Sequence, residues 1–425
     1  MSEKASNPEL NPASNRAAMA ISPAKVMVVV AQMEKPPHPT TQRRTPSDAY
    51  PEIQARLADR CRGNFTKQWM HTTKALIVHL THHNPMKTNL TSSLSLKSTM
   101  ALAIAWLLVA SEAMPQSLPR RQNDTIPAQV ESIYGRGLRY LSTSQSTDGS
   151  WGGGSGSRPG VVGLCLLAFL AYGEDPNHGP YANNIRKALN FIIQKHREGK
   201  DGYMGPQMYD HGFATLALAE CYGMVNDERI APALRKSVDL ILKAQKRNPR
   251  NAWRYSPDTT QADTTVSGCQ IVALLAARNA GIPVEDRAID AGLAYMKNCR
   301  SSAGAYGYTS KSSGRITLTA IGSLCFALAK KKDEPGYAKS LEHLRRNINT
   351  QEGTYPFYFR YYMSQALFQA DEELWQKWNK NNIRLLSAIQ LGDGSFAGNH
   401  GNAFCTSSAL LSLALNYRFL PIYEK

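Results

Sequence analysis

Residues 136–151 of this chain read RGLRYLSTSQSTDGSW. The first half of this segment spaces its apolar side chains as one face of a helix does. Gln145 follows that face, and the Asp-Gly pair that ends in Gly149 predicts a tight turn, because glycine readily adopts positive φ angles. Trp151 comes two residues later. The segment therefore predicts a helix end, a turn and a large aromatic residue, in that order.

The same pattern returns near the C-terminus, where residues 382–396 read NIRLLSAIQLGDGSF. Gln390, Gly394 and Phe396 are separated by the same offsets as their counterparts in the first copy. Fainter copies lie between the two, and one of them leads through Gln245 to Trp253. About six units of roughly 50 residues result, at the upper end of the range for repeat arrays.

A second apolar helix, rich in small residues, is predicted after the turns. The examples are residues 161–172, 213–222, 266–277, 318–329 and 409–417. Each unit is therefore predicted to be a helical hairpin with a partly polar first helix and a buried second helix, and no sustained strand pattern is present. Open arrays need polar caps at both ends, yet the end units here carry the best-formed motifs. This favours a closed ring in which Trp151, Trp253 and Phe396 pack between neighbouring hairpins.

The chain carries a formal net charge of +16, from 49 Lys+Arg and 33 Asp+Glu. The basic residues are spread thinly, so the surplus suits either an ordinary solvated face or contact with an anionic ligand or membrane surface. No nucleic-acid-binding module is visible, and no nucleic-acid partner is expected. The sequence does not indicate an oligomeric state.

An apolar run at residues 100–110 predicts export. Lys97 precedes it and Ser111-Glu112-Ala113 follows as a small-x-small cleavage signal, so residues 86–113 resemble a secretory signal peptide. Since such a signal must lie near the N-terminus, translation from Met86 is the simplest explanation of its position. Residues 1–85 are then a disordered leader from a mis-assigned start, residues 114–129 are a linker, and residues 130–425 are the folded domain. We expect a periplasmic or secreted protein.

Neither a metal site nor a cofactor is predicted. The leader contains His71, His79, His82 and His83, but metal ligands need a held geometry that a disordered segment lacks. Six cysteines follow the leader and lie mostly in apolar helices, where buried free thiols are favoured over disulfides.

The repeated pattern is Lys/Arg-Gly/Ala-x-x-aromatic-aliphatic-x-x-x-Gln-x-x-x-Gly-x-Trp, which is the QW motif. Over residues 130–425 the chain resembles the prenyltransferase and squalene oxidase repeat proteins, the superfamily of terpenoid cyclases and protein prenyltransferase β subunits. The resemblance implies an all-α fold, a single α6–α6 toroid of six helical-hairpin repeats. It also implies a central cavity that opens at one end of the inner ring.

The resemblance places the starts of the inner helices on this cavity. The residues expected there are Tyr209, Asp210, His211, Asp263, Thr264, Thr265, Arg315, Thr317, Arg360, Tyr361, Tyr362, Phe404, Cys405 and Thr406. Helix starts also present free backbone N–H groups, which favour anionic ligand groups.

Cyclase chemistry needs a strong acid and aromatic rings that stabilise a cation. Squalene cyclases carry Asp-x-Asp-Asp-Thr at an inner helix start, whereas residues 261–265 here read QADTT, so Asp263 and a following Thr alone match. Asp263 is predicted either as a catalytic acid paired with His211 or as a helix N-cap. In the first case Tyr361 and Tyr362 would stabilise the cation. In the second, His211 is a hydrogen-bonded residue at the barrel rim.

Two other enzyme classes are less well supported. Zinc-dependent prenyl transfer uses an Asp-x-Cys pair, but residues 402–405 read NAFC and lack the carboxylate, so Cys405 is expected to be a cavity-lining or core residue. Polysaccharide-degrading toroids use paired carboxylates, for which Asp210 and Asp263 are the candidates, with tyrosines such as Tyr306 and Tyr308 to stack on sugars.

Three functions therefore remain open. The toroid could bind an apolar, polyprenyl-like ligand, a glycan or a protein partner without catalysis. It could be an acid-initiated isomerase or cyclase that uses Asp263, or a polysaccharide-degrading enzyme. The degraded catalytic signatures favour binding.

Overall fold

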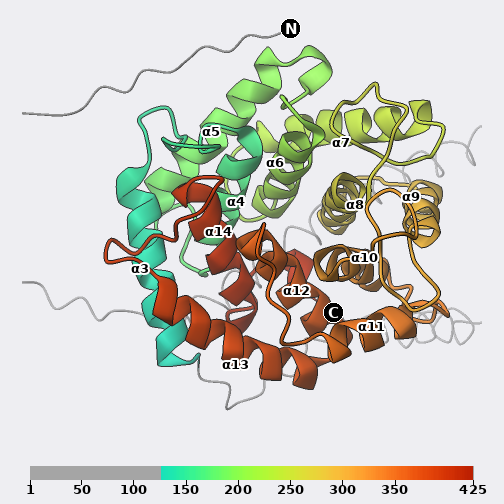
Figure 1. Ribbon diagram of the computed structural model, residues 1–425. Helices are drawn as coiled ribbons and strands as arrows, with labels where there is room; N and C mark the ends of the chain where they lie inside the picture. The colour runs from blue at the N-terminus through green and yellow to red at the C-terminus, as the bar shows by residue number, and fades with distance from the viewer. Residues whose placement is uncertain (1–125, 425) are drawn as a thin grey trace, which may run out of the picture. The chain divides into compact units, whose positions relative to one another are not determined.

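The structure is a computed structural model that describes residues 126–424 (Figure 1). The predicted leader, the predicted signal peptide and most of the predicted linker lie outside the described residues, as do the four leader histidines. Within the described region, twelve α-helices follow one another in six hairpins. No helix of this region is long and apolar enough to cross a membrane.

The first helices of the hairpins form the outer row. They are α3 (Ala128–Ser144), α5 (Ala182–Glu198), α7 (Ile230–Arg247), α9 (Asp286–Asn298), α11 (Tyr337–Arg346) and α13 (Glu372–Ile389). Each is amphipathic and buries one apolar face. In α7, for example, apolar residues are buried on one face and charged residues lie on the opposite face. These helices therefore cover the inner row and meet solvent on the outside.

The second helices form the inner row. They are α4 (Pro159–Leu170), α6 (Met208–Cys221), α8 (Thr264–Asn279), α10 (Ile316–Leu328), α12 (Pro356–Ala370) and α14 (Asn402–Leu413). Every residue of α4 is buried, because neighbours surround this helix on all sides. Small residues permit this close packing, and a Cβ at Gly163 would lie 2.8 Å from the carbonyl oxygen of Phe213 on α6.

The two rows close into a ring. Each inner helix packs against the inner helices before and after it, and α14 packs against α4. In the outer row, α13 likewise contacts α3. Residues 126–424 thus form a single α6–α6 toroid, which confirms the predicted all-α fold and the predicted closure (Figure 1).

A glutamine amide links neighbouring hairpins at the end of three outer helices. Gln145 Nε2 donates to the carbonyl oxygen of Gly149 in its own turn and to that of Asn184 in α5, both at 3.1 Å. Gln245 repeats this arrangement, with Nε2 donating to a carbonyl oxygen of its own turn at 3.0 Å and to Ala288 of α9 at 2.8 Å.

The third of these glutamines closes the ring. Gln390 Nε2 donates to the carbonyl oxygen of Gly394 at 2.8 Å and to that of Ile133 in α3 at 2.9 Å. The last hairpin therefore binds the first through the same pair of hydrogen bonds that joins hairpins inside the chain. These amide groups bridge the seams between repeats.

The turn glycines and aromatic residues complete the seams. Gly149 and Gly394 have φ angles of 92° and 89°, and a Cβ there would meet the carbonyl oxygens of Lys187 and Arg136 at 2.1 and 2.4 Å. Trp151 is buried, and its Nε1 donates to the carbonyl oxygen of Leu141 at 2.9 Å. Trp253 and Phe396 are also buried, in line with their predicted packing role.

The C-terminal segment packs against the far ends of inner helices. Its last turn, η4 (Pro421–Tyr423), contacts α8, and the Ile422 N–H donates to Glu220 Oε2 at 3.4 Å. Gln369, at the end of α12, donates to the carbonyl oxygen of Tyr423 at 3.3 Å. Glu220 is 2% exposed and forms no ion pair within the described residues, and burial raises its pKa to about 8.

The six cysteines of the described region are free and buried, as predicted. Burial raises the pKa of Cys165, so this thiol stays protonated and acts as a small apolar group.

The seam geometry predicts that Gly394→Ala destabilises the fold by about 2–4 kcal/mol, because the added Cβ meets backbone in a left-handed conformation. Gly392→Ala, in the same turn, is the matched control, since nothing lies within 4 Å of its Cβ. Urea denaturation of both variants measures the difference. Equal stability of the two variants would remove the close-approach explanation.

The buried Glu220 predicts a pH-dependent stability. Its folded-state pKa of about 8 lies above the ordinary value of 4.5, so its contribution is complete below pH 4.5 and is lost as pH rises through 8. The stability of the wild type relative to Glu220→Gln should therefore fall by up to about 5 kcal/mol over this window. Urea denaturation between pH 4.5 and 8.5 tests it, with the exposed Glu373→Gln as control. Parallel pH profiles for wild type and Glu220→Gln would contradict the expectation.

Candidate functional site

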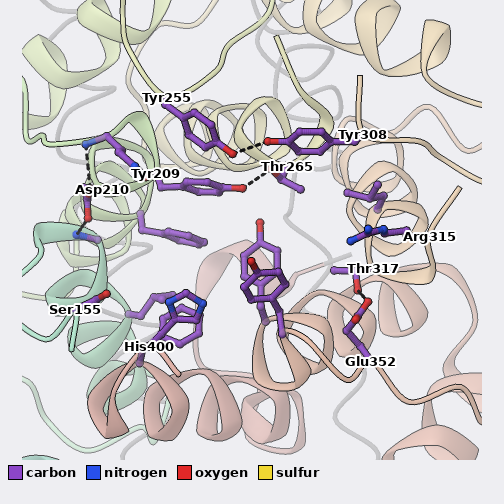
Figure 2. A pocket seen from close by; sticks show the side chains of 18 of the residues that line it. Ser155, Tyr209, Asp210, Tyr255, Thr265, Tyr308, Arg315, Thr317, Glu352 and His400 are labelled. Atoms are coloured by element: carbon purple, nitrogen blue, oxygen red, sulfur yellow. Dashed lines mark hydrogen bonds between the residues drawn. The ribbon is translucent and has the colours of Figure 1, made fainter. Parts of the chain in front are cut away.

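A cavity of about 870 Å³ opens at the N-terminal ends of the inner helices. All six inner helices contribute to its wall, together with the loops that precede them (Figure 2). The loop before α8 reaches over α6, where Met208 N–H donates to the carbonyl oxygen of Tyr255 at 2.8 Å. In the same way, the Thr264 N–H at the start of α8 donates to the backbone carbonyl oxygen of Tyr308 in the next loop, at 2.8 Å.

The cavity is polar at its mouth and apolar at its floor. Arg158, Gln207 and Arg315 precede the helices and line the mouth. Leu164 and Phe213 lie more than one helical turn into α4 and α6, and therefore line the deeper wall. The change from charged to apolar lining follows the direction of the inner helices.

Tightly packed aromatic rings lie beyond this floor. Tyr361 and Tyr362 are buried, with ring centroids 4.8 Å apart, and Tyr361 packs edge-on against Phe213 at 6.1 Å. Tyr358 bridges to the cavity wall, with its ring centroid 4.9 Å from that of Tyr362. Tyr361 and Tyr362 therefore do not line the cavity, a correction to the sequence prediction: their rings fill the barrel interior beneath it.

Asp210 lines the cavity but is held in an ion pair. Arg158 Nε donates to its Oδ1 at 3.0 Å, and a second guanidinium nitrogen contacts its Oδ2. The same carboxylate accepts the Gln207 N–H at 3.1 Å in a capping box at the start of α6. Its charge and lone pairs are thus used by the protein.

Asp263 caps helix α8 and does not line the cavity. Its Oδ1 accepts the N–H groups of Thr265 and Val266, each at 2.9 Å. Its side chain is fully buried, and Arg254 Nε lies 3.6 Å from Oδ2. Burial raises the pKa of this carboxyl group. Of the two roles predicted for Asp263, the structure supports the N-cap directly.

His211 faces an outer helix. Its Nδ1 accepts the Met204 N–H at 3.2 Å, and Nε2 lies 3.0 Å from the carbonyl oxygen of Ser237 in α7. The side chain is fully buried, and burial lowers its pKa to about 4. Because both ring nitrogens are engaged by backbone groups, the predicted pairing of His211 with Asp263 is wrong.

A row of hydroxyl groups connects the cavity to Asp263. The Tyr209 hydroxyl, on the cavity wall, donates to Thr265 Oγ1. The Thr265 hydroxyl in turn donates to Asp263 Oδ1 at 2.6 Å. Above this row the Tyr255 and Tyr308 hydroxyls are 2.6 Å apart (Figure 2). Tyr209 and Thr265 therefore stand between any bound molecule and the buried carboxylate.

A second set of polar side chains, separate from the hydroxyl row, lines the cavity near the start of α10. The Thr317 hydroxyl donates to Glu352 Oε2 at 3.1 Å, and the Thr354 N–H donates to Oε1 at 3.2 Å. Arg315 is exposed and lies at the cavity wall opposite Asp210 in Figure 2. Its guanidinium forms no ion pair with any residue that the structure describes.

Several wall residues were not predicted from the sequence. Tyr355 and His400 stack with ring centroids 5.4 Å apart, and Glu352 lies in the same loop as Tyr355. These residues precede the inner helices, in loops that show no periodic pattern. Their position shortly before an apolar helix is the one signal that could have found them.

Four other predicted lining residues do not lie on this cavity. The Thr264 hydroxyl donates to the carbonyl oxygen of Gly307 at 2.7 Å. Arg360 is buried between helices and donates to Asn382 Oδ1 at 2.9 Å. Cys405 borders a separate, smaller cavity of about 140 Å³. Thr406 is buried, and its Oγ1 accepts the Phe396 N–H at 2.9 Å. These placements correct the prediction, whereas Tyr209, Asp210, Thr265, Arg315, Thr317 and Phe404 do line the large cavity.

No family model and no curated protein matches the chain. Solved structures do. An inactive variant of the α-1,6-mannanase GH76A from Salegentibacter sp. HEL1_6, bound to α-1,6-mannotetrose, has a TM-score of 0.51 at 11% identity and covers 67% of this chain and 98% of its own. A variant of the type II terpene cyclase MstE from Scytonema, bound to geranylgeranyl dihydroxybenzoate, has a TM-score of 0.49 at 14% identity, with coverages of 69% and 98%.

At such low identity, this likeness concerns the fold alone. The mannanase comparison agrees with the α/α toroid described above, and the chemistry must come from the cavity itself. Among residues 126–424, no group of three or more His, Cys, Asp or Glu side chains is arranged to hold a metal ion.

The capping geometry predicts that Asp263→Ala costs about 1–2 kcal/mol of stability, because two backbone N–H groups lose their acceptor. Asp263→Asn is the matched control, since an asparagine oxygen can cap the same helix. Chemical denaturation compares the two variants. If asparagine costs as much as alanine, the capping bonds do not explain the role of Asp263 in stability.

Proposed function

We propose that the cavity binds a small amphipathic molecule with a polyprenyl-like apolar body. The observation that supports this proposal is the polarity gradient, with Leu164 and Phe213 deep in the cavity and Arg315 at its mouth. The volume of about 870 Å³ lies in the usual range for small-molecule sites. An apolar chain would displace water from the floor, while its polar end would remain hydrated at the mouth.

We further propose that residues 130–425 belong to the QW-motif superfamily and act outside the cytoplasm. The bridging amides of Gln145, Gln245 and Gln390 support the first part, because they occupy the motif's glutamine position at three seams. The signal-like residues 86–113 support the second. Sequencing the mature N-terminus tests export: a chain that still begins at Met1 would refute it.

Glycan cleavage is less well supported than binding. Hydrolysis needs two carboxyl groups flanking the scissile bond. Asp210 is neutralised by Arg158, and Asp263 lies behind Thr265, away from the cavity. The aromatic wall could still stack on a sugar ring, but Glu352 is left without a second available carboxylate.

Acid-initiated isomerisation is the second candidate, and the hydroxyl row supports it. In the structure the hydroxyls of Tyr209 and Thr265 donate toward Asp263. With Asp263 protonated these bonds would be reversed, so that Asp263 donates to Thr265, Thr265 to Tyr209, and Tyr209 to an alkene. The resulting cation would then lose a proton back to Tyr209 to give an isomer, and the row would return that proton to Asp263. Asp263→Asn should abolish turnover of a polyprenyl panel while ligand binding persists. If the wild type binds the panel but converts none of it, this candidate fails.

Binding itself is tested with cis-parinaryl alcohol, a neutral fluorescent chain. Leu318 lines the cavity, and Leu318→Trp would place an indole ring in the space that the apolar chain needs. This variant should weaken binding at least about tenfold. Ile389→Trp, at an exposed position on α13, controls for the added indole. A wild-type protein that does not bind the alcohol, or equal affinity in both variants, would refute the proposal.

A further inference from the structure

Arg315 differs from the other charged groups of the cavity. Arg158 and Asp210 neutralise each other, and Glu352 accepts hydrogen bonds from Thr317 and Thr354. The guanidinium of Arg315 forms no ion pair within residues 126–424, although it lines the mouth. Arginine presents five N–H donors in a planar fork that matches the two oxygens of a carboxylate or phosphate.

We propose that Arg315 forms a subsite for an oxyanionic head group, so that the preferred ligand is an amphipathic acid. This inference rests on the proposed binding function and names the chemistry of the ligand's polar end. The apolar body would lie against the floor, and the carboxylate or phosphate would meet Arg315 at the mouth.

The backbone of Arg315 is held firmly, which directs its side chain. Its N–H donates to the carbonyl oxygen of Tyr306 at 3.0 Å, and its own carbonyl accepts the Thr319 hydroxyl at 2.8 Å. Figure 2 shows the side chain projecting along the cavity wall. The residue is therefore fixed at its base, and its donors remain available to a ligand.

The neighbouring loop adds hydroxyl groups to the same side of the mouth. Thr309, Ser310, Ser312 and Ser313 all line the cavity. Hydroxyl groups can donate to further oxygens of a carboxylate or phosphate, whose hydrogen bonds are strengthened by the ligand's charge. Arg315 and this loop together offer a set of donors that an anionic group can use.

Glu352 does not favour a cationic head group instead. Its carboxylate already accepts one hydroxyl and one backbone N–H. A cationic head would have to compete with these donors and would leave Arg315 unpaired beside it. Residues 130–425 contain 34 Lys+Arg and 25 Asp+Glu, and this net charge of +9 adds a long-range field that attracts anions.

The experiment compares cis-parinarate with cis-parinaryl alcohol by fluorescence titration of the full chain. Wild type should bind the acid at least about tenfold more tightly, as expected for a charge-assisted hydrogen-bonded pair. Arg315→Gln should abolish this preference, because the acid loses its charge-assisted hydrogen bonds and its affinity falls to that of the alcohol. Lys311→Gln removes the same charge from the same loop but at an exposed residue outside the cavity lining, and should keep the preference.

Competition separates the sources of the head group. Laurate and lauryl phosphate, added to the parinarate complex, show whether the subsite takes a carboxylate or a phosphate, and stronger displacement by either supports it. Preferred binding of dodecylamine, or an unchanged acid preference in Arg315→Gln, would overturn the inference. If the alcohol and the acid bind equally, the head-group inference fails while the cavity proposal stands. If neither binds, the cavity proposal fails, and the head-group inference that rests on it fails with it.

Discussion

The toroid depends on one recurring interaction, the side-chain amide of a glutamine shared between two carbonyl groups. One carbonyl belongs to the glutamine's own turn and the other to the next outer helix, as Gln145 shows with Gly149 and Asn184. The same amide group therefore holds its own turn and the neighbouring hairpin together. Gln390 makes the same pair of bonds to the first hairpin, so the interaction that joins hairpins within the chain also joins the last hairpin to the first.

This order places the inner helix starts around a common opening, and packing decides the depth of the cavity. Tyrosine rings such as Tyr361 and Tyr362 occupy the barrel interior, so a ligand can enter only the upper part. The hydroxyl of Tyr209 and the guanidinium of Arg315 then mark two chemically different sides of the mouth. The Tyr209 hydroxyl leads to a buried carboxylate, whereas the Arg315 guanidinium lies at the mouth and forms no ion pair with any described residue.

The sequence predicted the hairpins and the ring because both follow from local patterns and their repetition. It also placed Tyr209, Thr265 and Arg315 at helix starts. At such positions, a shift of one residue along the helix changes which side chain faces the cavity. His211 could not be placed in the same way, because the direction of its side chain depends on α7, which is distant in the sequence. Glu352 was missed, since loop residues follow no period and their packing is set by tertiary contacts.

The closure of the ring has a consequence for chain connectivity. The first helix and the C-terminal segment lie together, with the rings of Tyr134 and Tyr417 in edge-on contact at 5.0 Å. A short tether between these ends, combined with a cut in one of the turns, would leave every seam in place. A circularly permuted chain would begin at a different hairpin but keep the same neighbours in the ring. Such chains could therefore adopt this architecture.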